Sequence, residues 1–299
     1  MRGELGAVVA LLVMTAIWGS TFVIVKDTVE EMAIGSFLAL RFAIATLVLV
    51  ALVPRAVLRL DRTTVRAGVL LGILYGLGQV LQTWGLANTS PSISGFVTSM
   101  YVVFTPLIVA VLVRARVRAT TWLAVAIALV GIGVLTVGGS AAGAGIGLGE
   151  LLTLASAAIY AGHIVALGAW SAGRDAIGLS VVQLATVTVV ALASTPLDGR
   201  VDLPPDGGAW LAVLYTAIAA GTLALLLQTW AQARIDPSRA AVVMMFEPVF
   251  AAGFAVIAGV EEPSLRMLVG GVLVLTSLYV VEAGARGSAD AGVVHVGPP

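Results

Sequence analysis

Residues 82–92 read QTWGLANTSPS, and residues 228–238 read QTWAQARIDPS. The triplet QTW and the closing PS pair recur together at an offset of 146 residues. Residues 16–25, AIWGSTFVIV, likewise resemble residues 158–167, AIYAGHIVAL, at an offset of 142. Because matches recur at nearly the same offset, about half of the chain length, the sequence is predicted to hold two copies of one unit.

The composition places both copies in a membrane. Of the 299 residues, 60% are hydrophobic and 11% are charged, and the mean hydropathy is +1.07. A helix needs about 20 mainly apolar residues to cross a bilayer. Such runs occur at 5–25, 33–53, 67–87, 92–113, 120–138, 148–169, 177–195, 209–232, 239–258 and 265–283. No alternation typical of barrel strands is found, and the first run lacks a signal-peptide cleavage pattern. We therefore expect an all-α polytopic membrane protein with ten transmembrane helices.

The basic residues support this count. With loops assigned alternately, three basic residues fall on one side, namely Lys26, Arg200 and Arg266, and Arg41 lies inside a span. The other twelve of the sixteen fall on the side of the N-terminus: Arg2, Arg55, Arg59, Arg62, Arg66, Arg114, Arg116, Arg118, Arg174, Arg234, Arg239 and Arg286. Basic loops stay in the cytoplasm. The asymmetry predicts a multi-pass protein of the cytoplasmic (plasma) membrane with both termini cytoplasmic.

Five spans per copy is an odd number, so the second copy must enter the membrane from the opposite side. We expect a first five-helix repeat at 1–142, an inverted second repeat at 143–285 and a disordered cytoplasmic tail at 286–299. Inverted repeats are typical of secondary transporters, whose substrate site lies near the midplane between the halves.

Four stretches carry a resemblance to a known family: WGSTFVIVK at 18–26, LRFAIATLVL at 40–49, GFVTSMYVVFTPLIVAVL at 95–112 and the run from QTWAQARIDPS through GVEEPS at 228–264. They resemble the EamA-like branch of the drug/metabolite transporter (DMT) superfamily. The resemblance covers nearly the whole chain and implies a ten-helix transporter of small metabolites, often working outward.

Two residues at matching places in the repeats are the first candidates for a central site. Glu247 follows Pro237 by ten residues, as Tyr101 follows Pro91. At 1.5 Å per residue, Glu247 is expected about 12–15 Å deep, where a charge is costly. It either binds a cationic substrate or a proton, or it holds a kink at Pro248. Tyr101 either contacts substrate or Glu247, or it only packs.

Arg41 is the other charged candidate within a span, expected about 10–13 Å deep. It is read as a clamp for a substrate carboxylate or as a structural guanidinium. Gln79, with Tyr75 one turn earlier on the same face, is a polar candidate near the midplane.

Three further candidates come from the paired first helices of the repeats. Trp18 and Tyr160 are counterparts that line the cavity or merely pack, and the small residues after them favour lining. His163 is a proton relay, a substrate contact or a hydrogen-bonded structural residue.

Pro106 and Pro248, 142 residues apart, are expected to break their helices. The pair Gln82 and Gln228 is interpreted as interfacial anchors and caps.

These features favour a secondary transporter that exports amino acids or related amphiphilic metabolites by alternating access, with a uniport, exchange or proton-coupled mode. A lipid-linked substrate flippase is the alternative, and an intramembrane enzyme a lesser one, because no nucleophile, metal or paired-aspartate motif is found. No cofactor, metal site or nucleic-acid partner is expected. The expected partners are a small-molecule substrate and the bilayer, with the protein a monomer or homodimer.

Overall fold

The computed structural model describes residues 2–58, 60–112, 114, 119–136, 146–171, 174–235, 240 and 243–289. Within these residues every regular element is a helix, and no strand occurs. Eight helical segments are long and apolar enough to cross a membrane, and two shorter apolar helices, Glu247–Ile257 and Leu265–Val280, follow them. The chain is therefore an all-helical, multi-pass membrane protein.

Within the described residues, the first half of the chain holds seven helices. They are α1 (Arg2–Glu31), α2 (Ile34–Leu52), the short α3 (Pro54–Val57), α4 (Arg62–Ala87), α5 (Pro91–Thr98), α6 (Tyr101–Leu112) and α7 (Ala119–Thr136). The second half holds α8 (Leu148–Ser171), α9 (Ala176–Ser194), the 3-10 turn η1 (Thr195–Asp198), α10 (Gly207–Tyr215), the π-helix η2 (Thr216–Leu223), α11 (Ala224–Gln232), α13 (Glu247–Ile257) and α14 (Leu265–Ala289).

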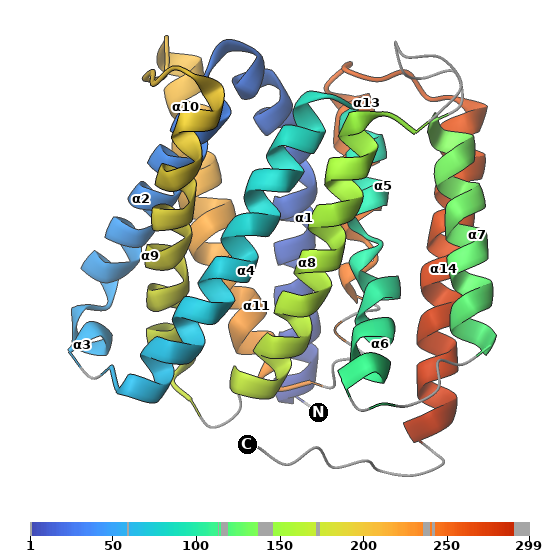
Figure 1. Cartoon of the computed structure of the whole chain (residues 1–299), viewed down its shortest axis with the longest axis horizontal. Coiled ribbons are helices and arrows are strands. Elements are labelled where there is room, and N and C mark those ends of the chain that lie inside the picture. Colours follow the sequence, from blue (N-terminus) through green and yellow to red (C-terminus); the bar gives the residue numbers. More distant parts are fainter. Residues whose placement is uncertain are drawn as a thin grey trace.

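The two halves interleave rather than standing side by side as separate bundles. In Figure 1 the helices run up and down, and α1 begins and α14 ends at the lower edge. Most helices of the first half pack on helices of the second: α1 on α11 and α13, α2 on α9, α4 on α8 and α9, and α7 on α14. One continuous core of buried apolar side chains therefore contains residues from both halves.

Small residues allow α4 and α9 to approach closely. Three glycines of α4 recur every fourth residue, Gly68, Gly72 and Gly76. A Cβ atom on Gly72 would lie 2.5 Å from the Cβ of Thr186 and 2.8 Å from the carbonyl oxygen of Gln183, both in α9. A stripe of small residues brings two backbones together in a membrane, where the hydrophobic effect between helices is absent.

Two spans are interrupted at matching places. Turn residues Ser99 and Met100 separate α5 from α6, and Met245 and Phe246 precede α13. The predicted span at 239–258 is consequently not one long helix in the described residues, because a new helix of 11 residues starts at Glu247.

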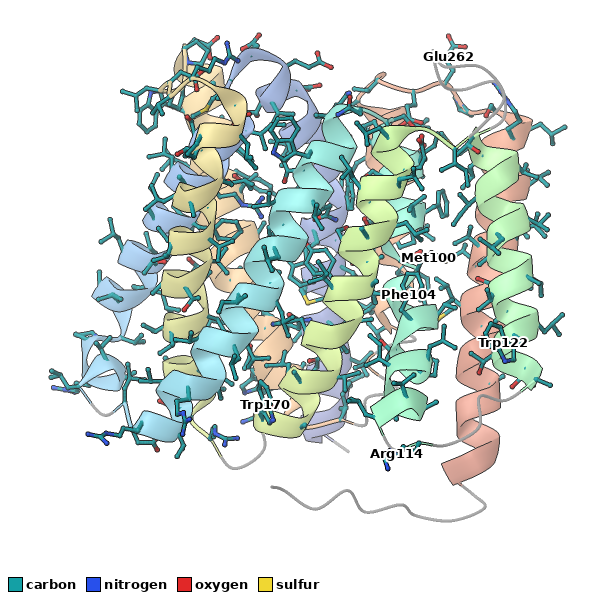
Figure 2. The ribbon with its side chains drawn as sticks, in the orientation of Figure 1. Met100, Phe104, Arg114, Trp122, Trp170 and Glu262 are labelled. Atoms are coloured by element: carbon teal, nitrogen blue, oxygen red, sulfur yellow. The ribbon has the colours of Figure 1, made fainter. Side chains whose placement is uncertain are left out.

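Some predictions need adjustment or fall outside the described residues. The predicted tail starts at 286, whereas α14 continues to Ala289. Residues 290–299, the repeat boundary at 142 and 143, and the arginines at 59, 116, 118 and 239 lie outside the described residues. Figure 2 places Arg114 at the lower end of the bundle, where α1 begins, and Glu262 at the upper end.

Candidate functional site

The bundle contains a cavity that both halves line. The space between its walls is about 690 Å³, counting the part that opens to the outside. All seven residues that the sequence predicted for a central cavity border it: Trp18, Arg41, Gln79, Tyr101, Tyr160, His163 and Glu247. They come from α1, α2, α4, α6, α8 and α13.

Tyr101 and Glu247 face each other because each is the first residue of the helix that follows a break. The Tyr101 hydroxyl donates to Glu247 Oε2 at 3.3 Å and lies 3.4 Å from the carbonyl oxygen of Met244. Glu247 sits at the N-terminus of α13, where unpaired backbone N–H groups favour a negative charge. Because of the helix break, both the Tyr101 hydroxyl and the positive end of the α13 dipole point toward the Glu247 carboxyl group.

The prediction that both prolines break their helices is wrong for Pro106. Pro106 does not break its helix, since α6 runs from Tyr101 to Leu112 through it. The interruption comes earlier, at Ser99 and Met100, so the proline removes only one bond within a continuing helix. Pro248 lies in the first turn of α13, a position where the missing N–H costs nothing.

Arg41 is held by backbone and aromatic groups. Its side chain is 4% exposed and that of Glu247 is 5% exposed. The Arg41 Nε donates to the carbonyl oxygen of Thr216 at 3.3 Å, and the guanidinium carbon lies 4.9 Å from the ring centre of Phe42. Among the described residues, neither Arg41 nor Glu247 takes part in an ion pair. The cavity thus carries a cation and an acid that the protein does not pair with each other.

The π-helix η2 explains how α1 and α2 find polar partners. At its end the Ala224 N–H reaches back five residues, to the carbonyl oxygen of Ala219. Such a wide turn frequently marks a functional site. Thr216, in this segment, accepts from Arg41, and the carbonyl oxygen of Ala220 accepts from Trp18 Nε1 at 3.0 Å.

A chain of hydrogen bonds crosses the cavity wall from α4 to α8 and α5. Gln79 Nε2 donates to the Tyr160 hydroxyl at 2.7 Å, and that hydroxyl donates to Gln82 Oε1 at 2.9 Å. Gln82 Nε2 then donates to the Thr98 hydroxyl at 3.1 Å. Gln79 consequently bonds Tyr160, while its predicted neighbour Tyr75 is also at the cavity wall.

His163 has a polar partner of its own. Its Nε2 lies 2.9 Å from Gln183 Oε1, and its ring centre is 5.3 Å from that of Tyr75. Gln183 is the counterpart of Arg41 in the repeat. The two side chains contact different neighbours, since Gln183 bonds His163 and Arg41 bonds the Thr216 carbonyl.

Two glutamines are among the cavity residues that the sequence interpretation did not predict. Gln82 and Gln228, read as interfacial anchors, both line the cavity. The sequence placed both residues near helix ends, away from a cavity expected at the midplane. In the structure the cavity extends far enough along the helices to reach them. The recurrence of QTW was the available signal for both.

The described residues hold no group of three or more His, Asp or Glu side chains that could bind a metal ion. What the cavity offers is a guanidinium, a carboxyl group, amides and aromatic rings, which suit a small molecule with polar and apolar parts. Fold and site together define a multi-pass helical membrane protein that encloses a cavity with both polar and apolar walls.

The chain belongs to the EamA-like transporter family. The sequence pattern of this family matches residues 5–137 and again residues 147–282. It is similar to an uncharacterized transporter of Archaeoglobus fulgidus, with 28% identity over 278 residues, 93% of this chain and 86% of that protein. A solved structure, titled only as the crystal structure of a protein, is similar with a TM-score of 0.68 and 24% identity. It covers 93% of this chain and 97% of its own, and this likeness concerns the fold alone. The protein is a membrane transporter.

Proposed function

We propose that the protein is a secondary transporter that exports small amphiphilic metabolites, such as amino acids or related compounds, across the cytoplasmic membrane. The observation that carries the proposal is the unpaired Arg41 and Glu247 on the walls of one cavity. Leaving two buried charges without each other is costly unless a ligand or solvent compensates them. A ligand with a carboxylate and a cationic group does so.

In this proposal the carboxylate binds Arg41, whose Nε is fixed on the Thr216 carbonyl. The two terminal nitrogens have no hydrogen-bond partner within the described residues and are available as a fork for a carboxylate. The cationic group is then attracted to Glu247, and the aromatic walls around Trp18 and Tyr160 take the apolar part.

Transport in this proposal follows alternating access. Two inverted five-helix repeats, ten crossings in all with both termini cytoplasmic, rock around the cavity between them. Support comes from the recurrence of QTW, from the matching breaks before Tyr101 and Glu247, and from a family match that covers each half in turn. Arg114 at the end where α1 begins agrees with a cytoplasmic N-terminus.

The test starts from substrate discovery. Metabolite profiles of cells with and without the protein give candidate substrates, and uptake of these by proteoliposomes containing the full chain establishes transport. We expect Arg41→Leu to reduce uptake by about 100-fold, because a buried charge-assisted contact is lost. Unchanged uptake in this variant, with normal amounts of protein in the vesicles, argues against the proposed site.

Proton coupling is tested separately at Glu247. If coupling runs through this residue, Glu247→Gln abolishes uptake driven by a pH gradient but keeps exchange of labelled against unlabelled substrate. Full gradient-driven uptake by the variant shows that protons do not couple at this residue.

A further inference from the structure

We propose that the carboxamide of Gln228 is a ligand-binding group of the cavity. It selects substrates whose side chain carries a group that both donates and accepts hydrogen bonds. This inference rests on the proposed transport of amino acids or related compounds.

Gln228 is buried at the cavity wall, and its amide oxygen has no partner within the described residues. Its side chain is 2% exposed and borders the cavity. Its Oε1 is covered by protein and has no hydrogen-bond partner within the described residues. Buried polar groups in proteins are nearly always bonded, so an unbonded amide oxygen in a cavity-lining side chain calls for a partner from the cavity.

The counterpart of Gln228 in the first repeat shows that a glutamine at this place in the repeat can find protein partners. Gln82, at the same place in the first QTW, is bonded to both Tyr160 and Thr98. The protein therefore uses the first glutamine to hold its own helices together and leaves the second for another molecule.

An amide presents a donor and an acceptor side by side, and a half-turn of its terminal bond exchanges them. The group that satisfies both at once is another amide or a group with the same pattern. Among amino acids, glutamine and asparagine have it, whereas methionine has nearly the shape of glutamine and lacks the pattern.

The experiment uses the full chain in proteoliposomes with an equimolar mixture of the twenty common L-amino acids as the probe. Mass spectrometry gives the uptake ratio of glutamine to methionine. We expect the wild type to favour glutamine and Gln228→Leu to lower the ratio about 10-fold, because the hydrogen bonds to the ligand are lost. Leucine fills similar space, so the variant should reach the vesicles in normal amounts.

The matched control is Gln232→Leu. Gln232 lies one turn further along α11 and also has a buried amide oxygen without a partner in the described residues, yet it does not line the cavity. We expect this variant to keep the wild-type ratio. Uptake with the same ratio in wild type and Gln228→Leu overturns the role of Gln228 alone. Absence of protein-dependent uptake of every amino acid overturns the proposed substrate class and this inference with it.

A second, independent observation concerns the upper end of the bundle in Figure 1. There, carboxylates of the second half accept hydrogen bonds from helix starts of the first half. Asp202 Oδ1 accepts the N–H of Ala33 at 3.0 Å, and Asp198 Oδ2 accepts that of Gly35 at 2.7 Å. The residue before α2 is alanine, which has no side chain to cap its own helix, so the other half supplies the caps.

The start of α5 is held in the same way. Glu261 Oε1 accepts the N–H of Ser92 at 2.8 Å, and the Ser92 hydroxyl donates to Glu261 Oε2. Glu150, at the start of α8, accepts from the Thr89 hydroxyl at 2.6 Å. We call these four carboxylates, Asp198, Asp202, Glu150 and Glu261, the carboxylate clasp.

The clasp is confined to one end. Apart from Glu247 in the cavity, every carboxylate that accepts from the opposite half, within the described residues, belongs to it. Bonds from ionised carboxylates to helix-start N–H groups are among the stronger hydrogen bonds. We infer that the clasp is the gate that closes this end of the cavity, and that it must release for substrate to pass there.

The absence of cysteine from the sequence makes this directly testable. Val25 lines the cavity next to Lys26, whose Nζ donates to Ala87 at the end of α4. Val25→Cys is labelled with a membrane-impermeant maleimide in sealed vesicles, from the side on which Glu262→Cys is labelled. We expect slow labelling, and about 10-fold faster labelling when Glu261→Gln or the pair Asp198→Asn and Asp202→Asn is added.

Glu262→Gln is the matched control, because Glu262 is the neighbour of Glu261 and points away from the bundle (Figure 2). It should leave the labelling rate of Val25→Cys unchanged. Equal rates in the clasp variants and in the control overturn the gate, and so does faster labelling only from the opposite side. Glu261→Gln and the pair Asp198→Asn with Asp202→Asn are separate variants. If one of them fails to reach the membrane, the other still tests the gate.

Discussion

The two copies of QTW are identical in sequence and have different surroundings in the fold. The first ends α4, an uninterrupted helix of 26 residues, and the second lies in α11, which follows the π-helix η2. Each helical segment starts at an aspartate cap, Asp61 for α4 and Asp206 for α10. A repeated sequence therefore preserves the helix but not the neighbours that its side chains meet.

The residue after QTW shows the difference most strongly. Gly85 follows the first copy, and a Cβ there would lie 2.3 Å from the Thr153 hydroxyl and 2.8 Å from the backbone oxygen of Gly149. Its counterpart is Ala231, which is buried and already carries a Cβ. The close contact between α4 and α8 thus has no equivalent at α11.

The largest predicted effect follows from this contact. Gly85→Ala should destabilise the protein by about 2–3 kcal/mol, because backbone atoms of α8 must move. Ala231→Gly should cost only about 1 kcal/mol, the loss of helix propensity. Thermal denaturation in detergent compares the two, and equal effects would show that the close approach of α4 and α8 is not what requires glycine.

Substitution of the two QTW glutamines should change stability by a smaller amount. Gln82→Leu removes two hydrogen bonds and leaves the Tyr160 and Thr98 hydroxyls without their partner, which should cost about 1–2 kcal/mol. Gln228→Leu breaks no bond to a described residue and should be neutral or stabilising. A loss of stability in Gln228→Leu as large as that in Gln82→Leu would make both glutamines structural.

The π-helix is probed through Trp18. Trp18→Phe removes the bond to the Ala220 carbonyl and should cost about 1 kcal/mol. Trp84→Phe is the matched change, since the Trp84 Nε1 is buried with no partner in the described part of the chain. We expect the second variant to be at least as stable as the wild type in the same melting experiment, and a cost above that of Trp18→Phe would contradict the assignment.

The smallest effect concerns the cap of α4 and depends on pH. The N–H of Thr64 and the hydroxyl of Thr63 donate to Asp61 and hold the pKa of that exposed carboxyl below its ordinary value. A lowered pKa in the folded state means that the stabilisation is complete above the ordinary value and is lost as the pH falls through and below it. Asp61→Ala should therefore be less stable than the wild type at neutral pH, by a margin that shrinks at about pH 3. Melting curves at both values test this, and a margin independent of pH contradicts it.

Much of the candidate site was predictable because depth in a membrane is readable from sequence. Counting residues from Pro91 and Pro237 placed Tyr101 and Glu247 at one level, and the structure brings their side chains within 3.3 Å. The same reasoning placed Gln82 and Gln228 near helix ends and predicted neither their place at the cavity wall nor their neighbours. Hydrogen-bond partners such as Tyr160 come from helices some 78 residues away in the chain.

The sequence by itself determined the all-helical membrane character, the limits of most spans and the family, since apolar runs and repeated motifs are local properties of the chain. Tertiary structure alone decided that α4 is continuous while a π-helix precedes α11, and that Arg41 meets a carbonyl group of that segment. It also decided that the second half caps the helix starts of the first. These contacts join residues more than 160 positions apart, and their geometry depends on how the helices pack rather than on any local pattern.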